Sequence, residues 1–159
     1  MKVISEFNYR NAKEIIQQSN PDLLKEIYEI LKIINLNLEI EEGKYQRDTS
    51  NQIQQIFVSK GWDKEVKSEA IPSMKYDLVK DKNFPVEIEI GHERLVYADF
   101  FEFLADYSNE NIKVGIMIVC NDSLKFGHNW HNSIKSTKNK ILAIKKSFLV
   151  PILVIGIDP

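Results

Sequence analysis

Apolar residues recur along this chain with two different periods, and each period predicts a different kind of element. A spacing of three and four residues indicates amphipathic helices, whereas strict alternation or a short continuous apolar run indicates strands. The helical spacing covers residues 11–35 and about 49–60, and Gly61 supplies a stop signal for the second helix. With a loop at 36–48, the whole pattern predicts helices at 11–35, 49–60, 95–107 and 132–146 and strands at 62–69, 75–80, 85–91, 114–120 and 149–157.

The order of these elements favours one α/β domain with a mixed sheet and helices packed on it. The strand at 85–91, the helix after it and the apolar run at 114–120 form a unit that favours parallel pairing through a right-handed crossover. Because proline has no backbone N–H, we expect Pro151 to lie near the start of the closing strand or on a strand at the edge of the sheet. We therefore expect a single domain over residues 1–159. Its parts are an N-terminal strand and helix region (1–48), a central core (49–120) and a basic helix with the closing strand (121–159).

Composition narrows the class of protein without naming a function. Hydrophobic residues make up 43% of the chain, charged residues 28%, and the formal net charge is −2, which fits a folded domain rather than a disordered one. No stretch approaches the roughly 18 apolar residues of a membrane span, and the first residues lack the apolar core of a signal peptide. Cys120 lies in an apolar run and is expected to be a small buried residue. We expect a cytoplasmic protein that does not cross a membrane.

Charge is distributed unevenly along the chain. Between Asp81 and Glu110 there are eight acidic residues and two basic ones, whereas from Ser123 to Ile157 there are six lysines and no acid. This asymmetry suits an enzyme that holds cations at one place and a polyanion at another. On charge alone, a solvated basic face with no partner explains the lysines equally well.

The strongest chemical signal is a set of three carboxylates on neighbouring predicted strands. Alternation sends Glu87 and Glu89 to one face of their strand and the apolar residues between them to the other, and Asp77 lies on the preceding strand. Adjacent like charges repel, and a hard divalent cation such as Mg²⁺ would remove that cost. The alternative is a half-exposed strand whose charged face lies in water.

The arrangement of these residues resembles the PD-(D/E)XK nuclease core, and its details are similar to type II restriction endonucleases of the BglII/BstYI kind. The resemblance spans nearly the whole chain. It is carried by the opening Lys2 to Phe7 running to Asn11-Ala12, the helix end Lys60-Gly61-Trp62, the block Asp77 to Asp99, and the close Pro151 to Pro159. It implies a mixed central β-sheet flanked by helices in a restriction-endonuclease-like core.

The resemblance also implies roles for the acidic residues. Asp77 takes the place of the aspartate that bridges the metal and the scissile phosphate, Glu87 that of the second acidic ligand, and the backbone carbonyl of Ile88 is the expected third protein oxygen. Glu89 takes a position that is lysine in most of the superfamily. Gln52 takes the place of a helix carboxylate that completes the site in relatives, although it brings no charge.

DNA and a second copy of the chain are the implied partners. A palindromic duplex target predicts a homodimer with one active site per strand. The implied reaction is Mg²⁺-dependent cleavage of double-stranded DNA, with Mn²⁺ as a substitute, at a short site with a GATC core, leaving 5′-phosphate and 3′-hydroxyl ends. The candidate DNA contacts are His92, Arg94, Asn132, Ser133, Lys135, Lys138 and Lys140.

Two departures from the family pattern keep other functions open. Gln52 lacks a charge, and the segment between Trp62 and Asp77 is shorter than in relatives. The alternatives are a repair or structure-specific nuclease of the same fold, or a catalytically impaired DNA-binding or dimerisation module. A soluble α/β domain with no nucleic-acid role is the remaining explanation. The pair His128 and His131 is better explained as a cluster in a loop or at a helix start that contacts DNA or a partner subunit than as a metal site.

Overall fold

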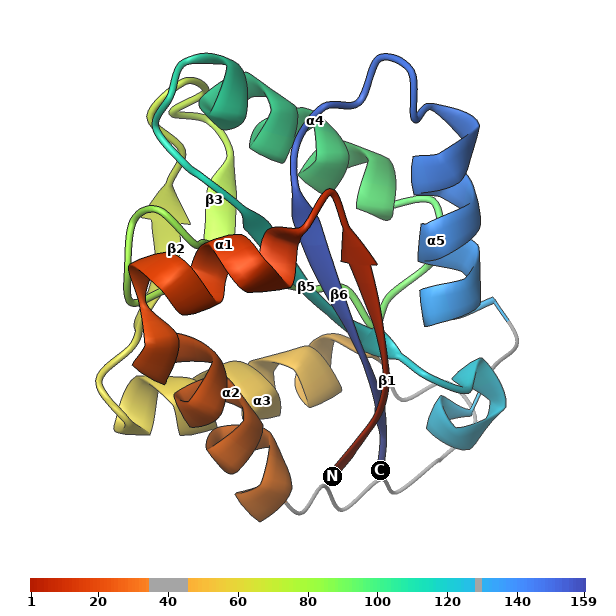
Figure 1. Ribbon diagram of the computed structural model, residues 1–159. Coiled ribbons are helices and arrows are strands. Elements are labelled where there is room, and N and C mark those ends of the chain that lie inside the picture. The colour runs from red at the N-terminus through yellow and green to blue at the C-terminus, as the bar shows by residue number, and fades with distance from the viewer. Residues whose placement is uncertain (35–45, 128–129) are drawn as a thin grey trace.

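Six strands form one mixed sheet in the order β1-β6-β5-β4-β3-β2 (Figure 1). The computed structural model describes residues 1–34, 46–127 and 130–159, and the side chains of α3 from residue 49 onward. Strands β4, β5 and β6 run parallel to one another, while β1, β2 and β3 each pair antiparallel. The elements are β1 (Lys2–Tyr9), α1 (Ala12–Ser19), α2 (Pro21–Ile33), α3 (Gln46–Ser59), β2 (Asp63–Lys67), β3 (Lys75–Val79), β4 (Val86–Ile88), α4 (Val96–Ser108), β5 (Gly115–Cys120), a 3₁₀ turn (Ser123–Phe126), α5 (Ile134–Ala143) and β6 (Ile152–Asp158).

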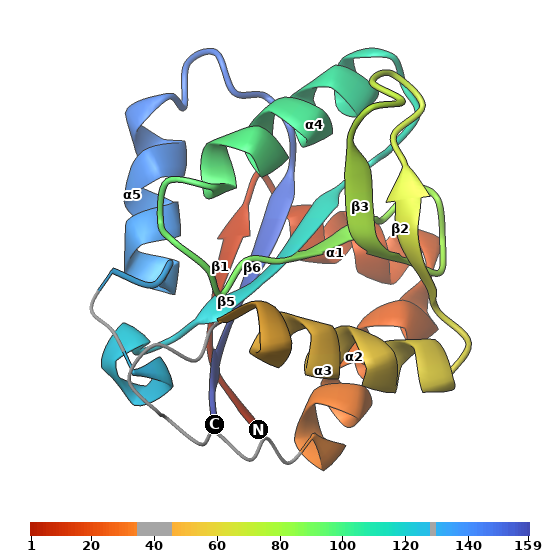
Figure 2. The same ribbon diagram turned by 180° about the vertical axis from the view of Figure 1, so that it is seen from behind.

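Each face of the sheet has its own apolar core. Helices α1, α2 and α3 pack on one face, where they meet Ile116 and Ile118 of β5. Helices α4 and α5 pack on the other face, where they meet Met117 and Val119 of the same strand. Figure 1 shows α1 crossing in front of the sheet, and Figure 2, seen from behind, shows α4 crossing it on the other side. The buried strand β5 therefore supplies both cores by simple alternation.

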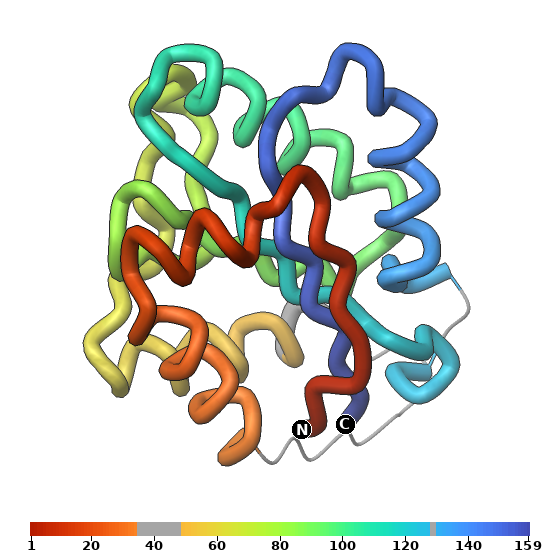
Figure 3. Tube along the Cα trace, in the orientation of Figure 1, coloured from red at the N-terminus to blue at the C-terminus, as the bar shows by residue number. Residues whose placement is uncertain are grey.

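The two ends of the chain lie together at one edge of the sheet. Strand β1 pairs with β6 from Lys2 opposite Asp158 to Tyr9 opposite Ile152, and Figure 3 shows the termini side by side. The predicted order of elements did not place this first strand, although strand and helix were expected within 1–48. Pro151 immediately precedes β6, so its missing N–H removes no bond from this interior strand.

Several predicted bounds are wrong in an instructive way. The single helix expected at 11–35 is two helices, because Asn20 leaves the helical conformation (φ −149°, ψ 81°) directly before Pro21. The strand expected at 85–91 ends at Ile88, and the helix expected at 95–107 begins at Val96. The parallel strand–helix–strand unit, the buried Cys120 and the mixed sheet are confirmed. Most of the expected loop at 36–48 lies outside the described residues.

The stop signal at the end of α3 is a backbone feature that only glycine meets without strain. Gly61 has φ +85°, and a Cβ built on it meets no heavy atom within 4 Å. Trp62 follows it into the core, where its ring meets Phe57 edge-on at 5.1 Å and its Nε1 donates to Glu26 Oε1 at 3.1 Å. The turn therefore delivers Trp62 to its buried place.

Replacing Gly61 isolates the cost of this conformation. We expect Gly61→Ala to lower the free energy of unfolding by about 1 kcal/mol, because alanine resists positive φ and no clash adds to the loss. Gly61→Asn should lose less, since asparagine tolerates the left-handed region. Urea unfolding of the three proteins measures both values. Equal losses for alanine and asparagine would contradict the conformational explanation.

No helix within the described ranges combines the length and the apolar character needed to cross a membrane.

Candidate active site

Glu87 is buried on the α4 side of the sheet. The predicted alternation is present, since Val86, Ile88 and Ile90 join the core beneath α1–α3 while Glu87 pairs in register with Met117 of the opposite core. Glu87 is only 5% exposed, and its Oε1 has no hydrogen-bond partner among the described atoms. An ionised carboxylate in that place is costly unless a cation or a proton meets it.

Asp77 lies on β3 beside this strand and is held from two directions. Its Oδ2 accepts a hydrogen bond from the backbone N–H of Ile88 at 2.8 Å, and its Oδ1 accepts one from Gln54 Nε2 at 2.7 Å. The first bond ties β3 to the end of β4, and the second ties it to α3. Asp77 is therefore fixed next to the peptide unit whose carbonyl is the candidate metal ligand.

Two further carboxylates reach the cluster from α4, and the sequence-based candidates did not include them. Asp99 and Glu102 are spaced three residues apart, so they share one face of the helix. Asp99 Oδ2 and Glu102 Oε1 are buried and have no hydrogen-bond partner among the described atoms. The signal in the sequence was that Asp99 directly precedes Phe100 and Glu102 directly precedes Phe103, two aromatic residues at helical spacing.

The crowding of these carboxylates raises their pKa values. Burial raises the pKa of Glu89 to about 7, and the charge of Asp77 adds to the shift. Burial, then Asp106, then Asp77 raise the pKa of Glu102 to about 7. Burial together with the neighbouring carboxylates raises the pKa values of Glu87 and Asp99 well above the usual range. The cluster therefore carries more negative charge than its surroundings stabilise.

Asp77 departs less from ordinary behaviour than its neighbours. Burial raises its pKa, but the N–H of Ile88 and the amide of Gln54 act in the opposite direction. These hydrogen bonds favour the ionised form of Asp77. Asp77 is thus the member of the cluster best prepared to present a negative charge.

The donor set fits a hard divalent cation in its chemistry. Carboxylate oxygens without partners and a backbone carbonyl are the ligands that Mg²⁺ takes. The Ile88 carbonyl accepts a long hydrogen bond from Ser50 Oγ at 3.4 Å, so it lies at the surface of α3 rather than in the sheet ladder. Within the described ranges, no three histidine, cysteine or acidic side chains are already gathered as ligands.

Gln52 is not among the residues brought to the carboxylates. It is exposed on α3, whereas Gln54, two positions on, is buried and donates to Asp77. Two residues along a helix are about 200° apart, so the two glutamines face opposite ways. The structure therefore places an amide at this site, but supplies it from Gln54.

The predicted DNA contacts divide into an exposed and an internal group. Arg94, Lys135 and Lys138 are exposed, and His92 is half-buried against the ring of Trp130 at 5.6 Å. Arg94 and His92 belong to the segment that follows β4, whereas Lys135 and Lys138 lie on α5, with Lys138 over the ring of Phe7 on β1.

The other three predicted contacts are used inside the protein. Asn132 is fully buried, and its Oδ1 accepts from Thr137 Oγ1 at 3.0 Å. Ser133 caps α5 by accepting from the N–H of Ser136 at 3.2 Å. Lys140 turns back onto Glu93 and Ser136. The histidine pair is not testable as a pair, because His128 lies outside the described residues, while His131 is buried with its Nδ1 2.9 Å from the Ile90 carbonyl.

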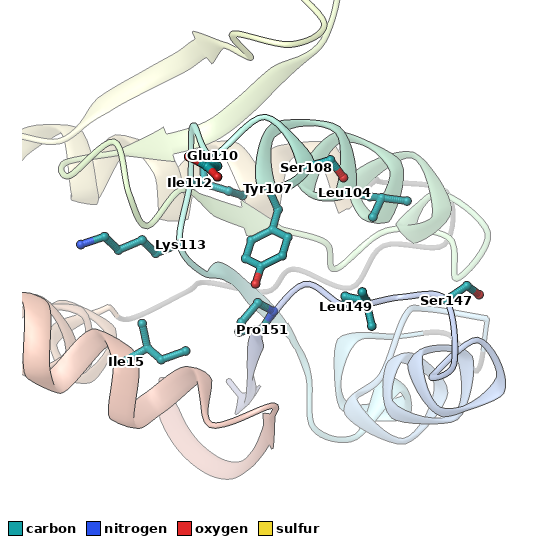
Figure 4. Close-up of a pocket in the computed structure, with 10 residues that line it drawn as sticks. All are labelled: Ile15, Leu104, Tyr107, Ser108, Glu110, Ile112, Lys113, Ser147, Leu149 and Pro151. Carbon is teal, nitrogen blue, oxygen red and sulfur yellow. The ribbon is translucent and has the colours of Figure 1, made fainter.

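A groove of about 870 Å³ lies at the other end of the sheet (Figure 4). Its lining includes Ile112 and Lys113 just before β5 and Pro151 just before β6. Because β4, β5 and β6 are parallel, these residues lie at the amino ends of the strands, whereas Glu89 follows the carboxyl end of β4. The groove is therefore separate from the carboxylate cluster.

Comparison with known proteins identifies one family model and two solved structures. The family model described as "Restriction endonuclease BglII/BglIII" matches residues 4–157. A crystal structure of restriction endonuclease BglII complexed with a DNA 16-mer superposes with a TM-score of 0.76 at 24% identity, over 98% of this chain and 76% of that one. A structure of free BglII gives 0.73 at 22% identity, over 100% and 80%. These two likenesses establish the shared fold. No curated protein sequence matches the chain at a significant level.

Proposed function

The chain belongs to the BglII/BglIII restriction endonuclease family and is thereby a type II site-specific deoxyribonuclease, and we propose that it hydrolyses double-stranded DNA at a short palindromic site in the presence of Mg²⁺. The products would carry 5′-phosphate and 3′-hydroxyl ends, and a site with a GATC core is the first to test. An enzyme with this substrate would act in the cytoplasm.

The observation that carries the proposal is the cluster of carboxylates at the carboxyl end of β4. Asp77, Glu87 and the Ile88 carbonyl would hold the metal ion, with Mn²⁺ as a substitute for Mg²⁺. When bound, Mg²⁺ lowers the pKa of a coordinated water and neutralises charge on the phosphate. The unpartnered oxygen of Glu87 supports a ligand role, because a cation would relieve its burial.

Glu89 is suited to manage the proton of the attacking water. It follows Glu87 and Ile88 directly at the end of β4, where a carboxylate can accept a proton from the attacking water. Gln54 and the N–H of Ile88 would keep Asp77 in place while the substrate binds. The side chains of the protein would thus hold Asp77 in position and accept the proton, and the metal ion would supply positive charge.

DNA would lie across the exposed side chains around this strand end. Lys135, Lys138 and Arg94 are exposed and can contact phosphates, and His92 lies beside Trp130. Such contacts fix the orientation of the duplex without reading its sequence. Asn132, Ser133 and Lys140 would support the site from within instead.

We propose a homodimer in which α4 supplies much of the interface. Phe101 is 60% exposed on the outer face of this helix, and Tyr97, one turn earlier, is also exposed. Exposed aromatic side chains at helical spacing on a folded domain are typical of protein interfaces. Two copies joined there would place one active site on each DNA strand.

Phe101→Arg should convert a dimer into a monomer. The new charge would be buried without a partner, which opposes association strongly. Sedimentation velocity at micromolar concentration measures the change, and Leu124→Arg is the matched control, because Leu124 is equally exposed but lies on the 3₁₀ turn away from α4. A Phe101→Arg protein that remains dimeric would place the interface elsewhere.

Incubation of unmethylated plasmid DNA with the purified protein and Mg²⁺ tests the proposed activity. Discrete fragments that disappear when EDTA is added support it. Random nicking, or cleavage confined to branched or mismatched DNA, would instead indicate a structure-specific nuclease of the same fold.

A DNA-binding module without cleavage activity is the second candidate. The observation that favours it is that no three acidic or histidine side chains are gathered as ligands within the described residues. It predicts salt-sensitive DNA binding, measured by fluorescence anisotropy, with no cleavage in either Mg²⁺ or Mn²⁺.

A further inference from the structure

The five residues after the catalytic strand form a short ribbon with the segment that leads into α5. His92 and His131 form an antiparallel bridge, and the backbone of Glu89–Glu93 is bonded on both sides of it. The bonds are Asn132 N–H to the Gly91 carbonyl at 2.7 Å, Glu93 N–H to the Trp130 carbonyl at 3.1 Å, and Asn132 Nδ2 to the Glu89 carbonyl at 3.4 Å. Glu89 is therefore attached to the start of α5, as well as to the sheet.

A cluster of side chains closes this ribbon against α5. Lys140 Nζ donates to the Glu93 carbonyl oxygen at 2.6 Å and to Ser136 Oγ at 2.7 Å, and it lies 3.7 Å from the Glu93 carboxylate. Ser136 Oγ in turn donates to Glu93 Oε2 at 2.9 Å. The ammonium also lies 5.7 Å from the ring centre of Tyr97 on α4. One lysine thus joins the ribbon to two helices.

The burial of Lys140 separates it from the other lysines of α5. Its side chain is 13% exposed, whereas Lys135 and Lys138 are exposed and Lys138 lies over the ring of Phe7. An ammonium that already donates two hydrogen bonds and is largely covered has little left for a phosphate. Lys140 is therefore better suited to hold Glu93 and Ser136 in place than to bind a DNA phosphate.

We propose that Lys140 and Glu93 are a positioning pair that fixes the Glu89 segment against α5, so that docking of α5 on the DNA backbone sets the position of Glu89. This inference rests on the proposed nuclease function and adds the link between DNA binding and chemistry. The connection runs from α5, which carries exposed Lys135 and Lys138, through the contacts of Lys140 with Glu93, and then along the backbone to Glu89. Neither Lys140 nor Glu93 touches the reacting atoms.

The expected effect is a loss of turnover with DNA affinity retained. A misplacement of about 1 Å at a catalytic group can cost on the order of 10²-fold in rate. We expect Lys140→Met to lower the single-turnover cleavage rate by roughly 10- to 100-fold. Binding of DNA in Ca²⁺, where cleavage does not interfere, should stay within about threefold, which is less than the ~1 kcal/mol of one exposed charge contact.

The experiment compares matched variants of the full-length protein. Lys140→Arg keeps a donor at this place and should recover much of the rate, and Glu93→Gln should not add its loss to that of Lys140→Met when the two are combined. Lys146→Met, on an exposed lysine outside the ribbon, is the control for removal of one charge. Hydrogen exchange at the amides of Glu93 and Asn132 supplies a readout independent of cleavage, and it should speed up in Lys140→Met. Thermal melting checks that each variant is folded, and Glu93→Gln carries the test if Lys140→Met is not.

The outcomes separate this inference from the proposed function. If the unaltered protein does not cut DNA, the nuclease proposal fails and the link fails with it. If the unaltered protein cuts and Lys140→Met cuts equally fast, the positioning pair alone is overturned. A Lys140→Met protein that loses DNA affinity and salt dependence as Lys138→Met does would show Lys140 to be a phosphate contact, which also overturns the pair.

Discussion

Asp77→Asn is expected to reduce the single-turnover rate of DNA cleavage in Mg²⁺ by roughly 10³-fold, the scale set by losing one essential electrostatic group. Hydrogen bonds from Ile88 and Gln54 favour the ionised form of Asp77. Asparagine keeps the size of the side chain but removes the charge that would face the metal. The loss should appear in the rate rather than in folding.

Plasmid cleavage followed over time measures this effect, with thermal melting as a check on folding. Asp63→Asn is the matched control, because Asp63 is an exposed aspartate on the neighbouring strand β2. It should cut at the unaltered rate. Unchanged cleavage by Asp77→Asn would remove Asp77 from the active site.

Glu102→Gln is expected to stabilise the metal-free protein at pH 8 and to leave it almost unchanged at pH 4.5. The pKa of Glu102 is about 7 in the folded protein against an ordinary value near 4.5. Below pH 4.5 the residue is protonated in both states, and the raised pKa has no effect on stability. Between pH 4.5 and 7 the unfolded chain ionises while Glu102 stays protonated in the folded protein, so the folded state loses stability over this range and the loss is complete above pH 7.

The size of the effect follows from the shift in pKa. Each pKa unit corresponds to about 1.4 kcal/mol, so a rise from 4.5 to about 7 costs on the order of 3 kcal/mol above pH 7. Glutamine cannot ionise and should recover most of that amount. Urea unfolding at the two pH values measures this gain in the free energy of unfolding, and Glu29→Gln, at an exposed residue of α2, is the control. A gain of equal size at both pH values, or a loss at pH 8, would contradict the account.

The strand residues of the site could be predicted from the sequence because alternation has one geometric outcome. Once Val86, Ile88 and Ile90 are buried on one face, Glu87 must face the other, and the structure confirms this. The apolar run of β5 likewise fixed the parallel unit. Local patterns were sufficient where a period of two left no alternative.

The helix residues of the site were harder to predict, because a helix offers several faces. Gln52 and Gln54 are separated by two positions, and only the packing of α3 decides which one meets Asp77. Asp99 and Glu102 belong to an otherwise ordinary amphipathic helix, and their burial depends on where α4 lies on the sheet. These contacts are tertiary, so no local pattern specifies them.

Long side chains were the least predictable part of the surface. Lys138 and Lys140 lie on the same helix and look equivalent in the sequence, yet one is exposed and the other is folded onto Glu93. A lysine has four rotatable bonds, and its direction is set by neighbours from other elements. The direction of Lys140 on α5 therefore depends on the ribbon between Glu89–Glu93 and Trp130–Asn132, which is a tertiary feature that the local sequence does not specify.

The most direct test of the central claim is to sequence the DNA ends produced by the purified protein from unmethylated plasmid DNA in Mg²⁺. The account predicts one short palindromic sequence at every cut, with ends that a ligase rejoins because they carry 5′-phosphate and 3′-hydroxyl groups. It also predicts that Glu87→Gln yields no such ends. Ends scattered over unrelated sequences, or an unchanged set from Glu87→Gln, would contradict the assignment of this carboxylate cluster as the site of sequence-specific cleavage.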